Sequence, residues 1–186
     1  MSLAEVKELK SPVKKWVPAK KQLFINGKWV DAKSGKTFDV ENPASGDIVA
    51  QAAEGDKADI DEAVKAARKA FESGPWKDMS ASERGKIVWK IGDLILKYAD
   101  ELAELESLDN GKPLAVAGAA DVPLSADLFH YMAGWATKIK GDTFQISTDH
   151  FYTPGQKYFT YTLKHQLELL VKLFLGIFHF LWQLGN

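Results

Sequence analysis

The 186-residue chain contains no cysteine. This absence excludes a disulfide framework, a thiolate zinc site, an iron–sulfur cluster and a cysteine nucleophile from the sequence. Histidine is scarce, and its four scattered residues leave little for a histidine metal cage: His130, His150, His165 and His179. The formal net charge of −1 gives no electrostatic reason to expect a nucleic-acid partner.

The glycine motifs of common nucleotide-binding and hydrolytic enzymes are missing as well. Ser34-Gly35-Lys36-Thr37 ends like a phosphate-binding P-loop, but Val30 stands where that motif needs its first glycine. No G-x-G-x-x-G and no G-x-S-x-G occurs. We interpret Asp149-His150 as loop residues because no plausible nucleophile lies near them in the sequence. Three acidic residues at a predicted helix surface are expected to be solvated: Glu101, Glu104 and Glu106.

What is present is enough to fold. Hydrophobic residues make up 46% of the chain, which can bury a real core, and the length fits one ordinary domain. Residues 1–22 differ, because they hold six lysines against two glutamates and are interrupted by Pro12 and Pro18. We predict a flexible basic tail there. It lacks the apolar run of a secretory signal and the arginines of a mitochondrial presequence, so we expect a cytoplasmic location.

The next segment has a strand-like pattern. Residues 23–30 form two short apolar runs around Asn26-Gly27, a dipeptide that tolerates the positive φ angles of a tight hairpin. Residues 37–40 and 48–52 follow, separated by a turn at 44–47. These patterns together predict an antiparallel β-meander.

The apolar period then becomes helical. Residues from Ile60 to Phe71 recur at three- and four-residue spacing until Gly74-Pro75 ends the helix. Ser80-Ala81-Ser82-Glu83 predicts a capping box at the start of a second helix. A shorter helix over 100–108 is expected to end at Asn110-Gly111, and a long one over 114–136 to kink at Pro123.

Two further strand candidates, 143–147 and 158–163, carry aromatic and β-branched residues suited to a sheet. Such a ribbon would be poorly covered by a small chain, which suggests pairing with another subunit or a further domain.

In order and spacing, several segments resemble the amino-terminal part of the NAD(P)-dependent aldehyde dehydrogenase superfamily, in its phenylacetaldehyde-type and betaine-aldehyde-type members. The resemblance covers roughly 23–164. It rests on Leu23-Phe24-Ile25-Asn26-Gly27-Lys28-Trp29, Val40-Glu41-Asn42-Pro43-Ala44-Ser45-Gly46, Asp61-Glu62-Ala63-Val64, Pro75-Trp76, Glu83-Arg84 and, most specifically, Leu105-Glu106-Ser107-Leu108-Asp109-Asn110-Gly111-Lys112-Pro113.

The resemblance implies an α/β fold: the β-meander and helices of a Rossmann-like cofactor domain over 23–141, and part of an oligomerisation ribbon over 142–164. It also implies an enzyme that oxidises an aldehyde to a carboxylate with NAD or NADP and works as a homo-oligomer. In that family a cysteine thiolate attacks the carbonyl and a glutamate activates water. Since these groups lie further along family chains, we assign no catalytic or cofactor-binding residue here and expect this chain alone to be inactive and to bind NAD poorly.

One site can be carried over residue by residue. Val40 and Glu41 match positions whose backbone carbonyls help to hold a structural monovalent cation in some family members, with Asp109 supplying a carboxylate. Hard oxygen ligands suit such an ion. The alternative is that Asp109 caps or buttresses the Asn110-Gly111 turn.

The resemblance stops at residues 165–186, which hold only two charged residues and seven leucines. When synonymous codons are chosen from Lys164 onward, one shifted reading frame encodes the family's Gly-Val-Val-Gly and Ile-Pro-Trp-Asn-Phe-Pro motifs. We therefore predict a frameshifted tail. The alternative is a non-enzymatic interaction or membrane-associated protein that uses this tail. The longest clean apolar run is about half of the ~20 residues that a spanning helix needs, so we expect no membrane attachment.

Overall fold

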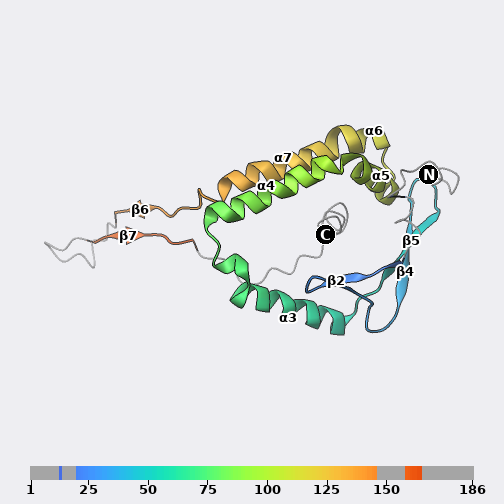
Figure 1. Ribbon diagram of the computed structural model, residues 1–186, viewed down its shortest axis with the longest axis horizontal. Helices are drawn as coiled ribbons and strands as arrows, with labels where there is room; N and C mark the ends of the chain where they lie inside the picture. Colours follow the sequence, from blue (N-terminus) through green and yellow to red (C-terminus); the bar gives the residue numbers. More distant parts are fainter. Residues whose placement is uncertain (1–12, 14–19, 146–157, 165–186) are drawn as a thin grey trace.

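The computed structural model describes residue 13, residues 20–145 and residues 158–164 (Figure 1). Most of the predicted basic tail, the Asp149-His150 pair and the tail over 165–186 lie outside these residues. Two long helices run side by side along one edge of the molecule, a third helix and the strands lie opposite them, and a narrow ribbon projects from one end (Figure 1).

The first strands form two hairpins. β2 (Leu23–Ile25) and β3 (Lys28–Val30) pair antiparallel, with Leu23 opposite Val30. Asn26 and Gly27 between them have φ angles of 55° and 74°, the left-handed values that a tight two-residue turn requires. β4 (Thr37–Glu41) and β5 (Ile48–Ala53) also pair antiparallel. Both predicted pairings are therefore confirmed.

The prediction of one continuous meander is wrong. β2 and β3 form a sheet of their own, whereas β4 and β5 belong to a three-stranded sheet of order β1-β5-β4. β1 (Lys20–Lys21) pairs parallel to β5, so two residues of the predicted tail are part of this sheet. The loop after β3 contacts the start of the next helix, where the Lys33 backbone N–H donates to Oδ1 of Asp59 at 3.1 Å.

Asp59 explains how the next helix starts. α3 (Lys57–Ser73) has Asp56 as its N-cap, and the two aspartates form a capping box in which Asp59 Oδ2 accepts from the Asp56 N–H at 3.1 Å. That hydrogen bond is the main reason why the pKa of the Asp59 carboxyl is lowered. The helix ends at Gly74, as predicted, and the short 3₁₀ helix η1 (Pro75–Lys77) follows.

The predicted capping box at Ser80 is confirmed, whereas the one at Asp56 was not predicted. α4 (Ala81–Lys97) begins after Ser80, whose Oγ accepts from the Glu83 N–H at 3.2 Å, while Glu83 Oε2 accepts from the Ser80 N–H at 2.9 Å. Hydrogen bonds from the Ser80 side chain and backbone lower the pKa of Glu83. α5 (Ala99–Asn110) follows directly and ends at Gly111.

The last helical region is irregular near Pro123, where a kink is predicted. α6 (Leu114–Val116) passes into a π-helical turn, η2 (Ala117–Asp121), and then into α7 (Val122–Trp135). The Val122 N–H donates to the Ala117 carbonyl, five residues back. Pro123 has no N–H and its ring crowds the carbonyl four residues earlier, so the wider turn accommodates it.

α4 and α7 pack antiparallel through small residues. A Cβ on Gly92 would lie 2.5 Å from the His130 ring and 3.0 Å from the Ala126 carbonyl oxygen, and one on Gly85 would lie 3.0 Å from the Ala133 carbonyl oxygen. Backbones this close leave no room for a side chain on the α4 face. A cluster of buried apolar residues lies beside this seam and comes from helical segments alone: Ile95, Leu102, Ala103, Ala117, Val122 and Ala126.

The predicted ribbon is present in its described part. β6 (Thr143–Phe144) and β7 (Thr160–Tyr161) pair antiparallel, with Thr143 opposite Tyr161. Its aromatic side chains are exposed, Phe159 to 79% and Tyr161 to 55%. Over 20–145 and 158–164 there is no helix with both the length and the apolar character to cross a bilayer.

Candidate functional site

The most specific family-like segment forms a tight turn at the end of α5. Gly111 has a φ of 75°, a left-handed conformation that suits glycine, and its N–H donates to the Ser107 carbonyl at 3.0 Å. Asn110 Oδ1 accepts from the Lys112 N–H at 2.9 Å, and Ser107 Oγ donates to the Lys112 carbonyl at 2.7 Å. Side chains on both sides of the turn therefore fix its shape.

A second turn packs against the first. Asn42 is fully buried after β4, and its Oδ1 accepts from the Ala44 N–H at 2.9 Å while its carbonyl accepts from the Gly46 N–H at 2.8 Å. A Cβ on Gly111 would lie 3.1 Å from both the Ala44 nitrogen and Pro43 Cγ. The ends of β4 and α5, which are nearly seventy residues apart, therefore meet here.

This meeting point bears on the predicted cation residues. Val40 and Glu41 are the last residues of β4, where a β-bulge shifts the strand register between them. Asp109 is exposed, two residues before Gly111. In the part of the chain that the structure describes, no three or more His, Asp and Glu side chains are grouped to hold a metal ion. A site here would therefore depend on backbone carbonyls as well as Asp109.

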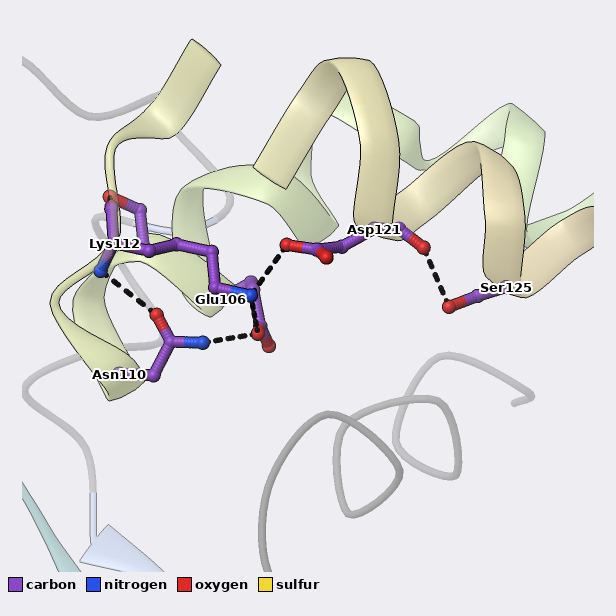
Figure 2. A network of polar contacts seen from close by, with 6 residues as sticks. Glu106, Asn110, Lys112, Asp121 and Ser125 are labelled. Carbon is purple, nitrogen blue, oxygen red and sulfur yellow. Dashed lines mark hydrogen bonds and ion pairs between the residues drawn. The ribbon is translucent and has the colours of Figure 1, made fainter. Parts of the chain in front are cut away.

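A partly buried ionic network lies next to the α5 turn (Figure 2). Lys112 Nζ lies 2.6 Å from Asp121 Oδ2 in η2 and 3.3 Å from Glu106 Oε1 in α5. The Asn110 side-chain amide also donates to Glu106, and Ser125 Oγ donates to the Asp121 carbonyl at 2.7 Å. One ammonium thus joins α5 to the π-helical turn.

The expectation that Glu104 and Glu106 are solvated is wrong. Only 8% of Glu104 and 6% of Glu106 is exposed, because α5 also buries Leu102, Ala103, Leu105 and Leu108 and is covered on several sides. Burial raises the pKa of the Glu106 carboxyl, and the Lys112 ammonium opposes this rise. Hydrogen bonds to Asp121 and then Glu106 raise the pKa of Lys112.

A third polar contact joins α4 and α7. His130 Nε2 lies 3.0 Å from Asp93 Oδ1, and the imidazole stacks on Trp89 with ring centroids 4.2 Å apart. Trp89 and Asp93 are four residues apart on α4 and so share a face. The pair was not predicted, because its partners are 37 residues apart in the sequence. Its position in the helix seam indicates a packing role.

Comparison with known proteins gives these features their context. The aldehyde dehydrogenase family model matches residues 29–162, well over half of the chain. The chain belongs to the aldehyde dehydrogenase family.

Curated relatives of the family are similar over the same region. Aldehyde dehydrogenase family 2 member B4, mitochondrial, from Arabidopsis thaliana is 50% identical over 135 residues, which cover 69% of this chain and 25% of that protein. The mitochondrial aldehyde dehydrogenase of Homo sapiens is 48% identical over 131 residues, covering 70% and 25%. The chain thus spans about a quarter of the length of these relatives.

Solved structures of the family confirm the α/β fold class. The NAD⁺ complex of aldehyde dehydrogenase from Bacillus cereus matches with a TM-score of 0.71 and 48% identity, covering 76% of this chain and 29% of that one. Betaine aldehyde dehydrogenase from Staphylococcus aureus matches with a TM-score of 0.66 and 36% identity, covering 74% and 27%. The described elements are therefore part of a larger α/β family fold.

Proposed function

We propose that this chain is the amino-terminal part of an NAD(P)-dependent aldehyde dehydrogenase, which oxidises an aldehyde to a carboxylate. The observation that carries the proposal is the family match over 29–162. The NAD⁺ complex of the Bacillus cereus relative supports a nicotinamide cofactor. Because the chain has no cysteine, it lacks the thiolate on which that chemistry depends, so we expect no turnover by this chain alone.

Formation of NADH or NADPH tests this proposal directly. The purified chain is incubated with NAD⁺ or NADP⁺ and a panel of aliphatic and aromatic aldehydes, and the Bacillus cereus enzyme serves as the positive control. We expect product from the control enzyme and none above the blank from this chain. Aldehyde-dependent NADH formation by the chain itself would show the proposal of an inactive part to be wrong.

For the cation site we propose that the Val40 and Glu41 carbonyls and the Asp109 carboxylate hold a monovalent ion. The bulge supports this, because backbone groups in a bulge are released from the regular ladder. The neighbouring turn is held by Asn110 and Ser107, which leaves the Asp109 carboxylate for another partner. Replacing tetramethylammonium with Na⁺ at constant ionic strength should raise the unfolding temperature of the parent chain and not that of Asp109→Asn.

The matched control for this measurement is Asp127→Asn, an exposed aspartate on α7. It should keep the parent's full response to Na⁺. An equal response in Asp109→Asn and the parent would exclude Asp109 as a ligand.

For assembly we propose that the β6–β7 ribbon pairs with a second subunit of the same enzyme. Its exposed aromatic residues support this, since an uncovered edge with apolar side chains favours association. Sedimentation velocity over a concentration series should show self-association that Phe159→Ser weakens and that Phe38→Ser, on the exposed side of β4, leaves unchanged. A monomer at all concentrations would argue against the ribbon as an interface.

We also propose a cytoplasmic location and a frameshift within the coding sequence near Lys164. The composition of residues 1–22 supports the first, although the Arabidopsis and human relatives carry the word mitochondrial in their names. Imaging of the full chain with a carboxy-terminal fluorescent tag tests the location.

The end of the family match at residue 162 supports the proposed frameshift. Sequencing of the encoding DNA tests it, and a shifted frame without Pro-Trp-Asn-Phe-Pro would exclude it.

A further inference from the structure

The chain contains the same tripeptide twice, and the fold places the two copies in different surroundings. Asn26-Gly27-Lys28 forms the turn between β2 and β3, and Asn110-Gly111-Lys112 lies at the end of α5. An asparagine followed by glycine can lose its side-chain amide spontaneously, because glycine has no Cβ to hinder attack by its own backbone nitrogen. Since both asparagines precede Gly-Lys, the attacking group is the same in both copies, and the surroundings decide how fast each one reacts.

We propose that Asn26 is a site of spontaneous deamidation in this chain and that the fold protects Asn110. In this reaction the Gly27 nitrogen bonds to Asn26 Cγ, the Cγ–Nδ2 bond breaks, and the Gly27 proton passes through solvent to the departing ammonia. Water then opens the succinimide ring that has formed. Opening on the Cγ side leaves aspartate, and opening on the backbone side leaves isoaspartate, so the reaction requires no oxidant or reductant.

The surroundings of Asn26 leave room for this attack. Asn26 and Gly27 are both exposed, and among the described residues no atom beyond the chain neighbours lies within 4 Å of a Cβ placed on Gly27. The strands on either side have only three residues each and form a sheet of their own. A hairpin this short is marginally stable, so its turn opens at a small cost in free energy.

The surroundings of Asn110 oppose the same attack. Its side-chain amide donates to Glu106 and its Oδ1 accepts from the Lys112 N–H at 2.9 Å, so both ends of the amide are held (Figure 2). The Gly111 N–H, which belongs to the attacking nitrogen, donates to the Ser107 carbonyl at 3.0 Å. A Cβ on Gly111 would lie 3.1 Å from atoms of the turn after β4, so a ring has little room to form. Reaction at Asn110 therefore requires the end of α5 to open first.

Deamidation changes the hairpin itself. Aspartate places a negative charge in the turn, whereas isoaspartate routes the backbone through Cβ and so lengthens the turn. The longer backbone does not fit the two-residue turn that sets Leu23 opposite Val30. The proposal is independent of aldehyde oxidation, because the reaction needs only this chain and water.

Peptide mass spectrometry on the full chain compares both sites in one sample. The purified chain is incubated in mildly alkaline buffer, and the fraction of each asparagine that has become acid is followed over time. We expect reaction at Asn26 to be about tenfold faster than at Asn110, or more, since the rates follow the open populations of the two turns. Asn42 is the matched negative control, because Pro43 has no N–H with which to attack.

The same measurement in concentrated urea isolates the contribution of the fold. Unfolding removes the contacts around Asn110, so the two identical tripeptides should then react at similar rates. A difference that persists in urea would trace it to the preceding residues, Ile25 and Asp109, and would overturn the proposal. Equal rates in the folded chain, or faster reaction at Asn110, would overturn it as well.

Discussion

Lys112 places one ammonium between two carboxylates, one of which is buried. Its Nζ lies 2.6 Å from Asp121 and 3.3 Å from Glu106, and only 6% of the Glu106 side chain is exposed. Replacing Lys112 with Met leaves the Glu106 charge without its ammonium in a place where water cannot compensate it. We expect Lys112→Met to lower the unfolding temperature by several degrees, measured by circular dichroism.

A double-mutant cycle with Glu106→Gln separates charge from packing. Lys112→Met should cost less in the Glu106→Gln background, because the buried charge is then absent. Lys69→Met, an exposed lysine of α3, is the control and should change stability little. Equal costs of Lys112→Met in both backgrounds would show that the Glu106 charge plays no part.

The pKa of Glu106 gives a pH-dependent prediction. Burial raises this pKa above its ordinary value of 4.5. Above pH 4.5 the unfolded chain therefore releases the Glu106 proton, while the folded chain still holds it until the pH passes the folded-state pKa. Its contribution to the free energy of unfolding is therefore greatest at acid pH and falls until the pH exceeds the folded-state pKa.

Glu106→Gln removes this dependence. The free energy of unfolding of Glu106→Gln minus that of the parent should therefore increase from pH 4.5 upward and then level off, with a slope of at most about 1.4 kcal/mol per pH unit. Urea titrations at several pH values measure the difference, in which carboxylates with lowered pKa values such as Asp59 cancel. A difference that falls as pH rises would contradict the raised pKa.

At the scale of elements, the α4–α7 seam depends on Gly92. A methyl group there would lie 2.5 Å from the His130 ring and 3.0 Å from a backbone oxygen. The contact should displace His130 from Trp89 and Asp93, and this cost exceeds the better helix propensity of alanine. We expect Gly92→Ala to destabilise the chain by about 1 kcal/mol or more, measured by urea unfolding.

Gly134→Ala is the matched helical control. It lies on α7, where among the described residues a Cβ would come within 4 Å of Lys138 Nζ alone, at 3.6 Å. Alanine there should stabilise the chain by up to about 1 kcal/mol through propensity alone. If both substitutions stabilised the chain, the close approach at Gly92 would be wrong.

The elements that sequence predicts correctly are those with local signals. The Asn26-Gly27 turn, the capping box at Ser80 and the glycine ends of α3 and α5 each depend on residues a few positions apart. The prediction of a single meander failed because the pairing of strands depends on contacts between distant residues, such as β1 with β5 and Lys33 with Asp59, which no local pattern shows. The burial of Glu106 was not predicted because it depends on how α5 is covered by other elements, and its network includes Asp121, which lies in a π-helical turn that no periodicity predicts.

At the scale of the whole molecule, the core is uneven. Its buried cluster comes from α4, α5, η2 and α7, whereas α3 buries only Asp59. Amides in helices with more buried contacts open less often. We expect native-state hydrogen exchange to be slowest in α4, α5 and α7 and faster in α3 and the β2–β3 hairpin. Uniform exchange over all of these elements would indicate a single cooperative unit instead.

The same scale limits what sequence can say about the site. From the sequence, only the family resemblance could predict that the ends of β4 and α5 lie close together, since no local pattern links Val40 to Asp109. Gly111 lies close to Pro43 and Ala44, so the two ends meet, and the cation site stays a prediction. The sodium experiment tests whether Val40, Glu41 and Asp109 bind a monovalent cation.

The π-helical turn before Pro123 also sets the rotational phase of everything that follows. The extra residue in that turn rotates α7 by about 100° relative to a regular helix continued from α6. In this orientation Ala126 faces Gly92, and Asp121, the last residue of the turn itself, lies 2.6 Å from Lys112 Nζ. Deletion of one residue from 117–120 would therefore misalign both the helix seam and the ion pair of Asp121, although the deleted residue belongs to neither. Pro123, through the wider turn that accommodates it, therefore helps to set the orientation of α7 about its own axis.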